Sequence, residues 1–306
     1  MGLFAPPPWG YDDGMDKNGF SNAQWAFLRV LGIAETVAVP PPPKNPGLPS
    51  VQTLPSCIGS PAVPKAELQA TAEADQLPGQ NQVMTLGQTS PAHGAVPSDA
   101  HLGQRGRMIQ AMDWGELTHS IHACRACSLG ETRQHAVVGA GTPAGPWLFV
   151  GEAPGAEEDR RGEAFVGRGG QLLDAMLRAM GLSRQQNVYI TNVLKCRPPN
   201  NRDPLGPEVK ACLPFLQRQI ALLQPKVIVA LGRFAAQGLL QSQEPLANLR
   251  GKPQFYGEIP VIVTYHPAYL LRNPVDKRKA WLDLQLALRT FAQHSSRTAA
   301  SAVATE

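Results

Sequence analysis

Three side chains in the second half of the sequence are suited to binding and polarising a flat, amide-containing ring. Asn192 carries a donor and an acceptor on one amide group, which matches the edge of such a ring. His266 can donate a hydrogen bond to an oxygen on which negative charge develops, and Phe165 can stack on a planar ligand. Each residue alone also has an ordinary explanation: a loop contact, a strand cap and a core side chain. Their chemistry becomes meaningful only if the fold brings them together.

The elements that would position these residues follow from short apolar runs and from helical periodicity. We predict strands at 147–150, 188–194, 227–231 and 261–265, and helices at 114–122, 172–180, from 207, at 233–240 and from about 276. Strands that alternate with helices indicate an α/β fold, with a parallel sheet covered by helices on both faces. Sites in such sheets lie at the carboxyl ends of the strands. We therefore expect Gly151, Glu152, Asn192 and His266 to converge at one edge of the sheet.

A glycine-rich loop joins the first predicted strand to its helix. It begins Gly151-Glu-Ala-Pro-Gly155, continues through acidic residues to Phe165-Val-Gly167, and reaches the helix at Gly170-Gln-Leu-Leu173. Glycines let a backbone approach a ligand closely, and a helix N-terminus offers free N–H groups. An ordinary crossover loop would have the same position. We favour a ligand site, with substrate contacts from Gly151, Ala153, Pro154, Gly155 and Phe165.

Four cysteines form a second group with ligand chemistry. Cys124 and Cys127 form a Cys-x2-Cys pair, and Cys196 and Cys212 follow later in the chain. Four thiolates suit zinc or an iron–sulfur cluster, and the wide separation of the second pair favours a cluster. Cys212 also lies in an apolar helical stripe and could be a core thiol. Cys57 has no partner at ligand spacing and is left out.

The composition divides the chain into unequal parts. We expect a Pro/Ala/Gln-rich, disordered extension over 1–110, a globular domain over 111–294 and a disordered tail over 295–306. The pattern at 21–32 predicts a short amphipathic helix, which either packs on the domain or binds a protein partner. A net charge of +4 suits a polyanionic partner. No apolar stretch is long enough to cross a membrane and no secretory signal is visible, so we expect a cytoplasmic monomer.

Residues 115–292 resemble the family 4, iron–sulfur uracil-DNA glycosylases. The resemblance rests on Gly151-Glu-Ala-Pro-Gly155 with Phe165-Val-Gly167, on Thr191-Asn-Val-Leu-Lys-Cys196-Arg-Pro-Pro, on His266-Pro with Leu270-Leu-Arg272, and on the order of the cysteines. It implies a three-layer α/β/α sandwich with a central four-stranded parallel sheet. It also implies a [4Fe–4S] cluster held by Cys124, Cys127, Cys196 and Cys212, and excision of uracil from single- or double-stranded DNA.

In that interpretation the uracil is flipped out of the DNA and read in a pocket. Phe165 would stack on it, Asn192 would bind its N3–H and O4, and His266 would stabilise charge on O2. Ala153 stands where related glycosylases have a water-activating Asp, which leaves Glu152 to position water or shape the pocket. Leu270, Leu271 and Arg272 would press into the DNA. The predicted phosphate contacts are Lys195, Arg197, Arg202 and Arg168.

Three other functions are compatible with parts of this pattern. One is a superfamily member that binds uracil-DNA or crosslinks itself to it, although the sequence lacks an additional basic loop between Asn192 and Cys212. Another is a non-catalytic iron–sulfur DNA-binding module linked to replication, which would not need Asn192 and His266. The third is a zinc protein of unrelated function.

Overall fold

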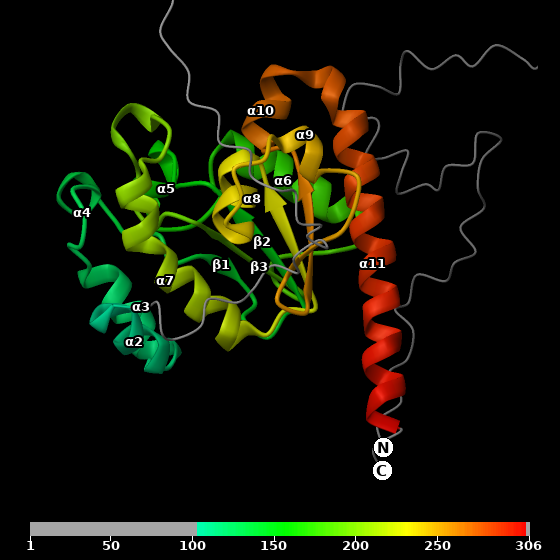
Figure 1. Cartoon of the computed structure of the whole chain (residues 1–306). Helices are drawn as coiled ribbons and strands as arrows, with labels where there is room; N and C mark the ends of the chain where they lie inside the picture. Colours follow the sequence, from blue (N-terminus) through cyan, green and yellow to red (C-terminus); the bar gives the residue numbers. More distant parts are fainter. Residues whose placement is uncertain (1–102, 304–306) are drawn as a thin grey trace, which may run out of the picture. The chain divides into compact units, whose positions relative to one another are not determined.

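The computed structural model describes residues 103–303, all within one compact unit, with side chains described up to residue 296. The predicted helix at 21–32, the extension before residue 103 and Cys57 lie outside the described residues. A six-stranded sheet of order β1-β3-β2-β4-β6-β5 lies at the centre (Figure 1). Its strands are β1 (Ala140–Gly141), β2 (Trp147–Gly151), β3 (Val188–Asn192), β4 (Val227–Leu231), β5 (Gln254–Tyr256) and β6 (Ile259–Thr264).

The four central strands confirm the predicted parallel sheet. β2 pairs in parallel with β3 and β4, and β4 pairs in parallel with β6. All residues of β2, β3 and β4 are buried, which explains why apolar residues predominate in them. The antiparallel edge strands β1 and β5 were not predicted, because two and three residues are too few to show a period.

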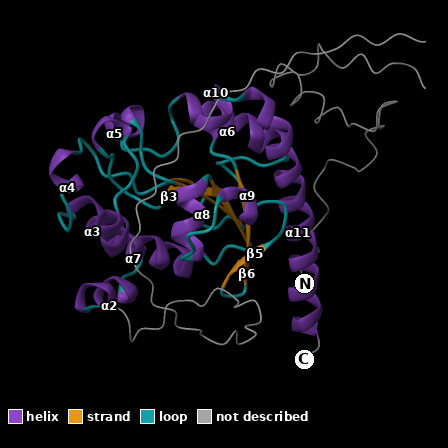
Figure 2. Ribbon diagram, turned by 45° about the horizontal axis from the view of Figure 1, so that its top comes forward, coloured by secondary structure: helices purple, strands orange, loops and turns teal. Residues whose placement is uncertain are grey.

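Helices cover both faces of this sheet, as Figure 2 shows. They are α2 (Gln104–Ala111), α3 (Trp114–Ala123), α4 (Leu129–Thr132), α5 (Ala156–Arg161), α6 (Arg168–Ala179), α7 (Gly206–Leu223), α8 (Arg233–Leu240), α9 (Leu246–Leu249), α10 (Pro267–Arg272) and α11 (Lys277–Val303), with 3₁₀ turns at Pro199–Asn201 and Pro274–Asp276. No helix in this part of the chain is apolar over enough turns to cross a bilayer.

The two apolar cores confirm the three-layer arrangement. On one face, strand residues such as Phe149 pack with Leu173 of α6 and Leu284 of α11. On the other face, neighbouring strand residues such as Leu148 pack with Leu216 of α7 and other side chains of α8 and α9. Successive strand residues point to opposite faces, so each strand contributes to both cores.

The structure moves both predicted domain boundaries. α2 begins at Gln104, before the predicted start at 111, and Ile109 is buried in a third apolar cluster with α3, α4 and α7. α11 continues to Val303, past the predicted tail start at 295. The α2 segment is polar in composition, so its sequence resembles a linker, although one buried apolar residue such as Ile109 is enough to attach a helix to a formed core.

Candidate active site and cysteine cluster

The carboxyl ends of the parallel strands open into one pocket of about 860 Å³. Glu152 after β2, Asn192 at the end of β3, Gly232 after β4 and His266 after β6 all line it. The loop residues Ala153, Pro154, Gly155 and Phe165 complete the wall. The sheet order reverses direction beside β2, where the crevice of an open α/β sheet lies. The predicted convergence of the three chemical side chains is therefore present in the structure.

Asn192 lies at the base of this pocket with an unused acceptor. Its side chain is 1 % exposed, and its Oδ1 is buried without a hydrogen-bond partner in the described structure. Gly151, which pairs with Asn192 across β2 and β3, lies directly behind it. A Cβ at Gly151 would collide with both Asn192 Oδ1 and the Phe165 ring. The absence of a side chain at Gly151 thus lets the amide and the ring approach each other.

Phe165 is held in a backbone conformation that L-residues rarely adopt. Its φ is +54°, and its ring is buried beside His266, with ring centroids 5.6 Å apart. Strain of this kind persists only where the surroundings enforce it. At Gly170, in the first turn of α6, a Cβ would collide with the carbonyl of Phe165, so this position accepts only glycine.

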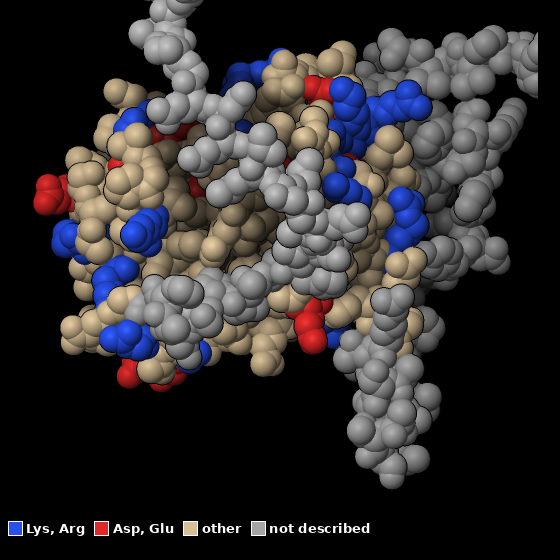
Figure 3. Space-filling view, viewed as in Figure 1, with Lys and Arg blue, Asp and Glu red and all other residues tan. Residues whose placement is uncertain are grey.

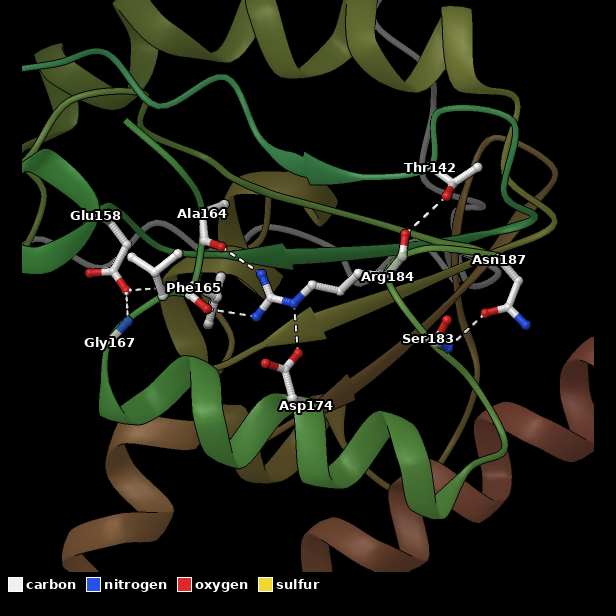
Figure 4. A network of polar contacts seen from close by, with 10 residues as sticks. Thr142, Glu158, Ala164, Phe165, Gly167, Asp174, Ser183, Arg184 and Asn187 are labelled. Carbon is white, nitrogen blue, oxygen red and sulfur yellow. Dashed lines mark hydrogen bonds and ion pairs between the residues drawn. The ribbon is translucent and has the colours of Figure 1, made fainter. Parts of the chain in front are cut away.

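Two side chains enforce the loop conformation, and the residue types alone did not predict this role for either of them (Figure 4). Arg184 donates from Nη1 to the Ala164 carbonyl at 2.7 Å and from Nη2 to the Phe165 carbonyl at 2.6 Å, while Asp174 binds its Nε at 2.6 Å. Glu158 accepts from the amides after Phe165, at 2.9 Å from Val166 and 2.8 Å from Gly167. Arg184 therefore holds the loop around Phe165 from one side, and Glu158 holds it from the other.

His266 is oriented by its own helix and is neutral near pH 7. As the N-cap of α10, its Nδ1 accepts a hydrogen bond from the Ala268 amide at 3.1 Å. Burial, and secondly the positive charge of Arg272, lower the pKa of His266 to about 4. A neutral imidazole that accepts at Nδ1 carries its proton on Nε2. The second ring nitrogen of His266 is consequently a hydrogen-bond donor.

Glu152 is a half-buried carboxyl group that also lines the pocket. Burial, and secondly the negative charge of Asp203, raise the pKa of Glu152 to about 7, against a lowering effect of Arg233. Arg233 and Asp203 form an exposed ion pair at 3.3 Å. Glu152 thus changes its charge near neutral pH, as suits an acid or base.

Two of the predicted DNA contacts lie inside the protein. Leu270 is 1 % exposed and belongs to the core between the sheet, α6 and α11, so it cannot act as a surface wedge without unpacking. Lys195 is also 1 % exposed, and its Nζ donates to Thr191 Oγ1 at 2.7 Å and to the Asn192 carbonyl at 2.6 Å. Both predictions are corrected: in a folded protein these groups do not reach a phosphate or a base.

The remaining predicted contacts are nearer the surface. Leu271 is 37 % exposed, and Arg272 is exposed and lines the pocket, as does Arg168. Arg202 also lines the pocket but pairs with Glu208, and the partly buried Arg197 donates to Asn201 Oδ1 at 2.8 Å. Their contacts with DNA stay predictions.

The four predicted cysteine ligands line one small cavity beside α3 and α7. Cys124 and Cys127 follow α3, Cys196 follows β3, and Cys212 lies in α7. All four are free thiols. Burial raises the pKa of Cys212 to about 12, so without a metal this thiol stays protonated. In the described residues, no three His, Cys, Asp or Glu side chains are grouped so that they could hold a metal ion.

Donors and positive charges surround the sulfur atoms. Arg133 Nη1 donates to Cys196 Sγ at 2.9 Å, and the Lys195 amide donates to Cys212 Sγ at 3.3 Å. Arg105 Nη2 lies 3.5 Å from Cys124 Sγ. Cationic groups and N–H donors stabilise thiolates. Because the Lys195 side chain binds the Asn192 carbonyl, this residue also connects the cysteine cavity to the strand that carries Asn192.

The pocket residues lie in the part of the chain that matches a known protein family. The family model of the Uracil DNA glycosylase superfamily matches residues 138–285, which include Glu152, Phe165, Asn192 and His266. A type-4 uracil-DNA glycosylase of Archaeoglobus fulgidus is 45 % identical over 167 residues, which cover 52 % of this chain and 83 % of that protein. The chain belongs to the type-4 uracil-DNA glycosylase family.

Two further type-4 uracil-DNA glycosylases show how much of the chain is shared. The protein of Thermotoga maritima is 46 % identical over 159 residues, which cover 51 % of this chain and 82 % of that protein. That of Pyrobaculum aerophilum is 43 % identical over 183 residues, which cover 57 % of this chain and 93 % of that protein. Most of each relative thus matches about half of this chain.

Proposed function

We propose that this protein hydrolyses the N-glycosidic bond of deoxyuridine in DNA, releasing uracil and leaving an abasic site for repair. The observation that carries this proposal is the buried, unpaired Oδ1 of Asn192 beside the Phe165 ring. An unpaired buried acceptor costs stability and is retained where a ligand supplies its partner. Membership of the type-4 family indicates which ligand that is.

Recognition of uracil follows from the chemistry of its edge. A uracil flipped into the pocket would stack on Phe165, while Asn192 Oδ1 accepts from N3–H and Nδ2 donates to O4. Cytosine presents an acceptor at N3 and a donor at N4, so it would oppose the same amide. Asn192 therefore distinguishes uracil from cytosine by hydrogen-bond direction.

Cleavage requires that negative charge on the departing uracil be stabilised. His266 Nε2–H would donate to uracil O2, where charge accumulates as the glycosidic bond breaks. The imidazole is neutral over the physiological range, with a pKa of about 4, so it stabilises the anion without transferring a proton. A water molecule then attacks the sugar. Ala153 offers no base, and the ionised carboxylate of Glu152 lies in the pocket as the group that orients this water.

We expect uracil excision to show a pH dependence that comes from Glu152. With a pKa of about 7, its carboxylate forms between pH 6 and 8, so kcat/KM should rise through pH 7 in the wild type. Glu152→Gln should remove that rise and lower the rate at pH 8 by about 10²-fold, the lower end of what a positioned base contributes. The measurement is kcat/KM from pH 5 to 9. As a matched control, Asp203→Asn should keep the inflection but move it to lower pH, because Asp203 raises this pKa.

The same carboxyl group affects folding stability. Its folded-state pKa of about 7 is above the ordinary value of 4.5, so the folded state binds more protons between these pH values. The free energy of unfolding therefore falls as pH rises from 4.5 to 7. Glu152→Gln should be more stable than the wild type at pH 8, by on the order of 2 kcal/mol, and similar at pH 4. If kcat/KM of Glu152→Gln still rose through pH 7, the titrating group would be a residue other than Glu152.

We also propose that Cys124, Cys127, Cys196 and Cys212 hold a [4Fe–4S] cluster. A cluster of four irons accepts one thiolate on each iron, which suits the four cysteines that line this cavity. Arg105, Arg133 and Lys195 provide positive charge around the thiolates. Glycosidic hydrolysis transfers no electrons, so the cluster would serve to connect the segments before β2 and after β3.

The purified protein tests the cluster directly. We expect a yellow-brown protein with iron and acid-labile sulfide in equal amounts. Cys196→Ser should lose the colour and lower the free energy of unfolding, because its buried sulfur joins the segment after β3 to the site. Cys57→Ser, outside the proposed ligand set, should keep the colour. A colourless wild-type protein with zinc would contradict the proposal.

The function is tested by release of free uracil from a labelled oligonucleotide with one deoxyuridine. We expect uracil and an alkali-labile site, with no product from thymidine or deoxycytidine controls. Tight binding without release would instead favour a binding module, and protein covalently attached to DNA would favour the crosslinking alternative. The cytoplasmic location, the monomeric state and a protein partner for residues 21–32 stay predictions.

A further inference from the structure

Two tyrosines and an arginine form a stack on the pocket wall that uracil recognition does not use. The rings of Tyr265 and Tyr269 lie nearly parallel, at 12°, with centroids 5.2 Å apart. The guanidinium of Arg250 lies over the Tyr265 ring, 4.0 Å from its centroid. Arg250 is fixed in turn by Asp283, with Nη2 2.7 Å from the buried carboxylate. The order of the stack is therefore Arg250, Tyr265, Tyr269.

The outermost ring is held from its hydroxyl end. Tyr269 donates to Asp276 Oδ2 at 2.7 Å, and Lys279 binds the other oxygen of Asp276 at 2.8 Å. A ring fixed by stacking and by its hydroxyl group loses little entropy when a ligand binds to it. Both tyrosines line the pocket, although only part of each is buried with the core.

The position of the stack suits a part of the DNA next to the flipped base. Tyr265 immediately precedes His266, and Tyr269 and Arg272 share one face of α10 because they are three residues apart. Arg272 is near enough to His266 to lower its pKa, so its charge lies beside the reacting base. Figure 3 shows Lys and Arg side chains gathered over α10 and the start of α11, where Lys277, Arg278 and Lys279 follow one another.

The pocket is also much larger than one pyrimidine. It has a volume of about 860 Å³, and Tyr265 and Tyr269 line it together with Asn192, Phe165 and His266. The flipped nucleotide would occupy the end at Asn192, and the tyrosine end remains for a second planar group. Base–aromatic stacking tolerates any sequence, because every base has a π face.

We propose that Tyr269, supported by Tyr265 and Arg250, binds the nucleobase adjacent to the flipped uracil by stacking, with Arg272 at the intervening phosphate. This inference rests on the proposed uracil excision and adds a second base subsite to it. A neighbouring base leaves its own stack more readily in single-stranded DNA than in a duplex. The subsite therefore favours single-stranded or locally opened substrate.

The test uses single-stranded oligonucleotides in which the nucleotide beside deoxyuridine, on one side or the other, is normal or lacks its base. For Tyr269→Ala we expect KM on the normal substrate to rise by about 5–150-fold, the range for losing one base–aromatic stack. Removing the adjacent base on the correct side should weaken wild-type binding similarly, and should have little additional effect on Tyr269→Ala. Tyr269→Phe keeps the ring and should recover most of the affinity.

Two outcomes separate this inference from its alternatives. If Tyr269→Ala loses the same factor on every substrate, the tyrosine only supports α10 and the inference is wrong. The inference is equally wrong if wild-type KM does not depend on the adjacent base. Failure of the wild type to release uracil from any substrate would instead contradict the proposed function. Val275→Ala, an 86 % exposed neighbour of α10, is the surface control and should behave as the wild type.

Discussion

Replacing His266 by alanine should lower kcat for uracil excision by about 10²–10³-fold, as expected for loss of one donor to a developing oxyanion. The imidazole is placed by the Ala268 amide at its Nδ1 and by the core beneath α10, so its Nε2–H is preorganised toward the pocket. KM should change much less than kcat, because the bond to O2 strengthens only as charge develops. Single-turnover release of labelled uracil measures the chemical step directly.

The pH dependence of wild-type uracil excision provides a second test of the role of His266. With a pKa of about 4, His266 is neutral throughout the range from pH 6 to 9, so it should contribute no inflection there. His119→Ala, at an exposed position of α3, is the matched control and should retain full activity. A His266→Ala variant within a few-fold of the wild type would remove His266 from the mechanism.

Changing Asn192 should alter which base is removed. Asn192→Ala should lower kcat/KM on uracil strongly, because both hydrogen bonds to the base edge are lost at a site buried from water. Asn192→Asp presents acceptors only, which suit the N4 amine of cytosine and repel uracil O4. We expect the ratio of uracil to cytosine excision to fall by about 5–150-fold, the range for one bidentate base contact.

The Asp variant has a feature that favours its folding. Lys195 Nζ binds the Asn192 carbonyl, so a positive charge already lies near the new carboxylate. Matched oligonucleotides with one deoxyuridine or one deoxycytidine give the ratio, and Asn248→Asp at an exposed position of α9 is the control. Unchanged preference in Asn192→Asp, with activity retained, would show that another residue reads the base.

The apolar runs and their order were sufficient to predict the central sheet. Strands β2, β3 and β4 are buried on both faces, so most of their residues are apolar, and this pattern is visible in a single sequence. Asn192 stood out near the end of such a run and His266 directly after another, because polar side chains at these places are costly unless they are used. Their meeting at one edge follows from parallel strand direction alone.

For the remaining site residues, the sequence could not determine whether each side chain faces the core, the pocket or solvent. Lys195 lies among basic residues and appears exposed, yet it is buried between Asn192 and the cysteine cavity. In α10, Leu270 turns into the core, while Tyr269 and Arg272 face the pocket. A helix of six residues is too short for its periodicity to reveal this choice.

Only the tertiary structure shows which residues distant in the chain contact each other. Arg184 is nineteen residues from Phe165 in the chain, in a stretch with no recognisable pattern, and it holds the strained loop through two backbone carbonyls. Backbone carbonyls are the same at every position, so nothing in the residue types indicates which of them an arginine will bind. The sequence by itself determined the sheet and the chemistry at its edge. The tertiary structure decided how the side chains are held, because that depends on partners distant in the chain.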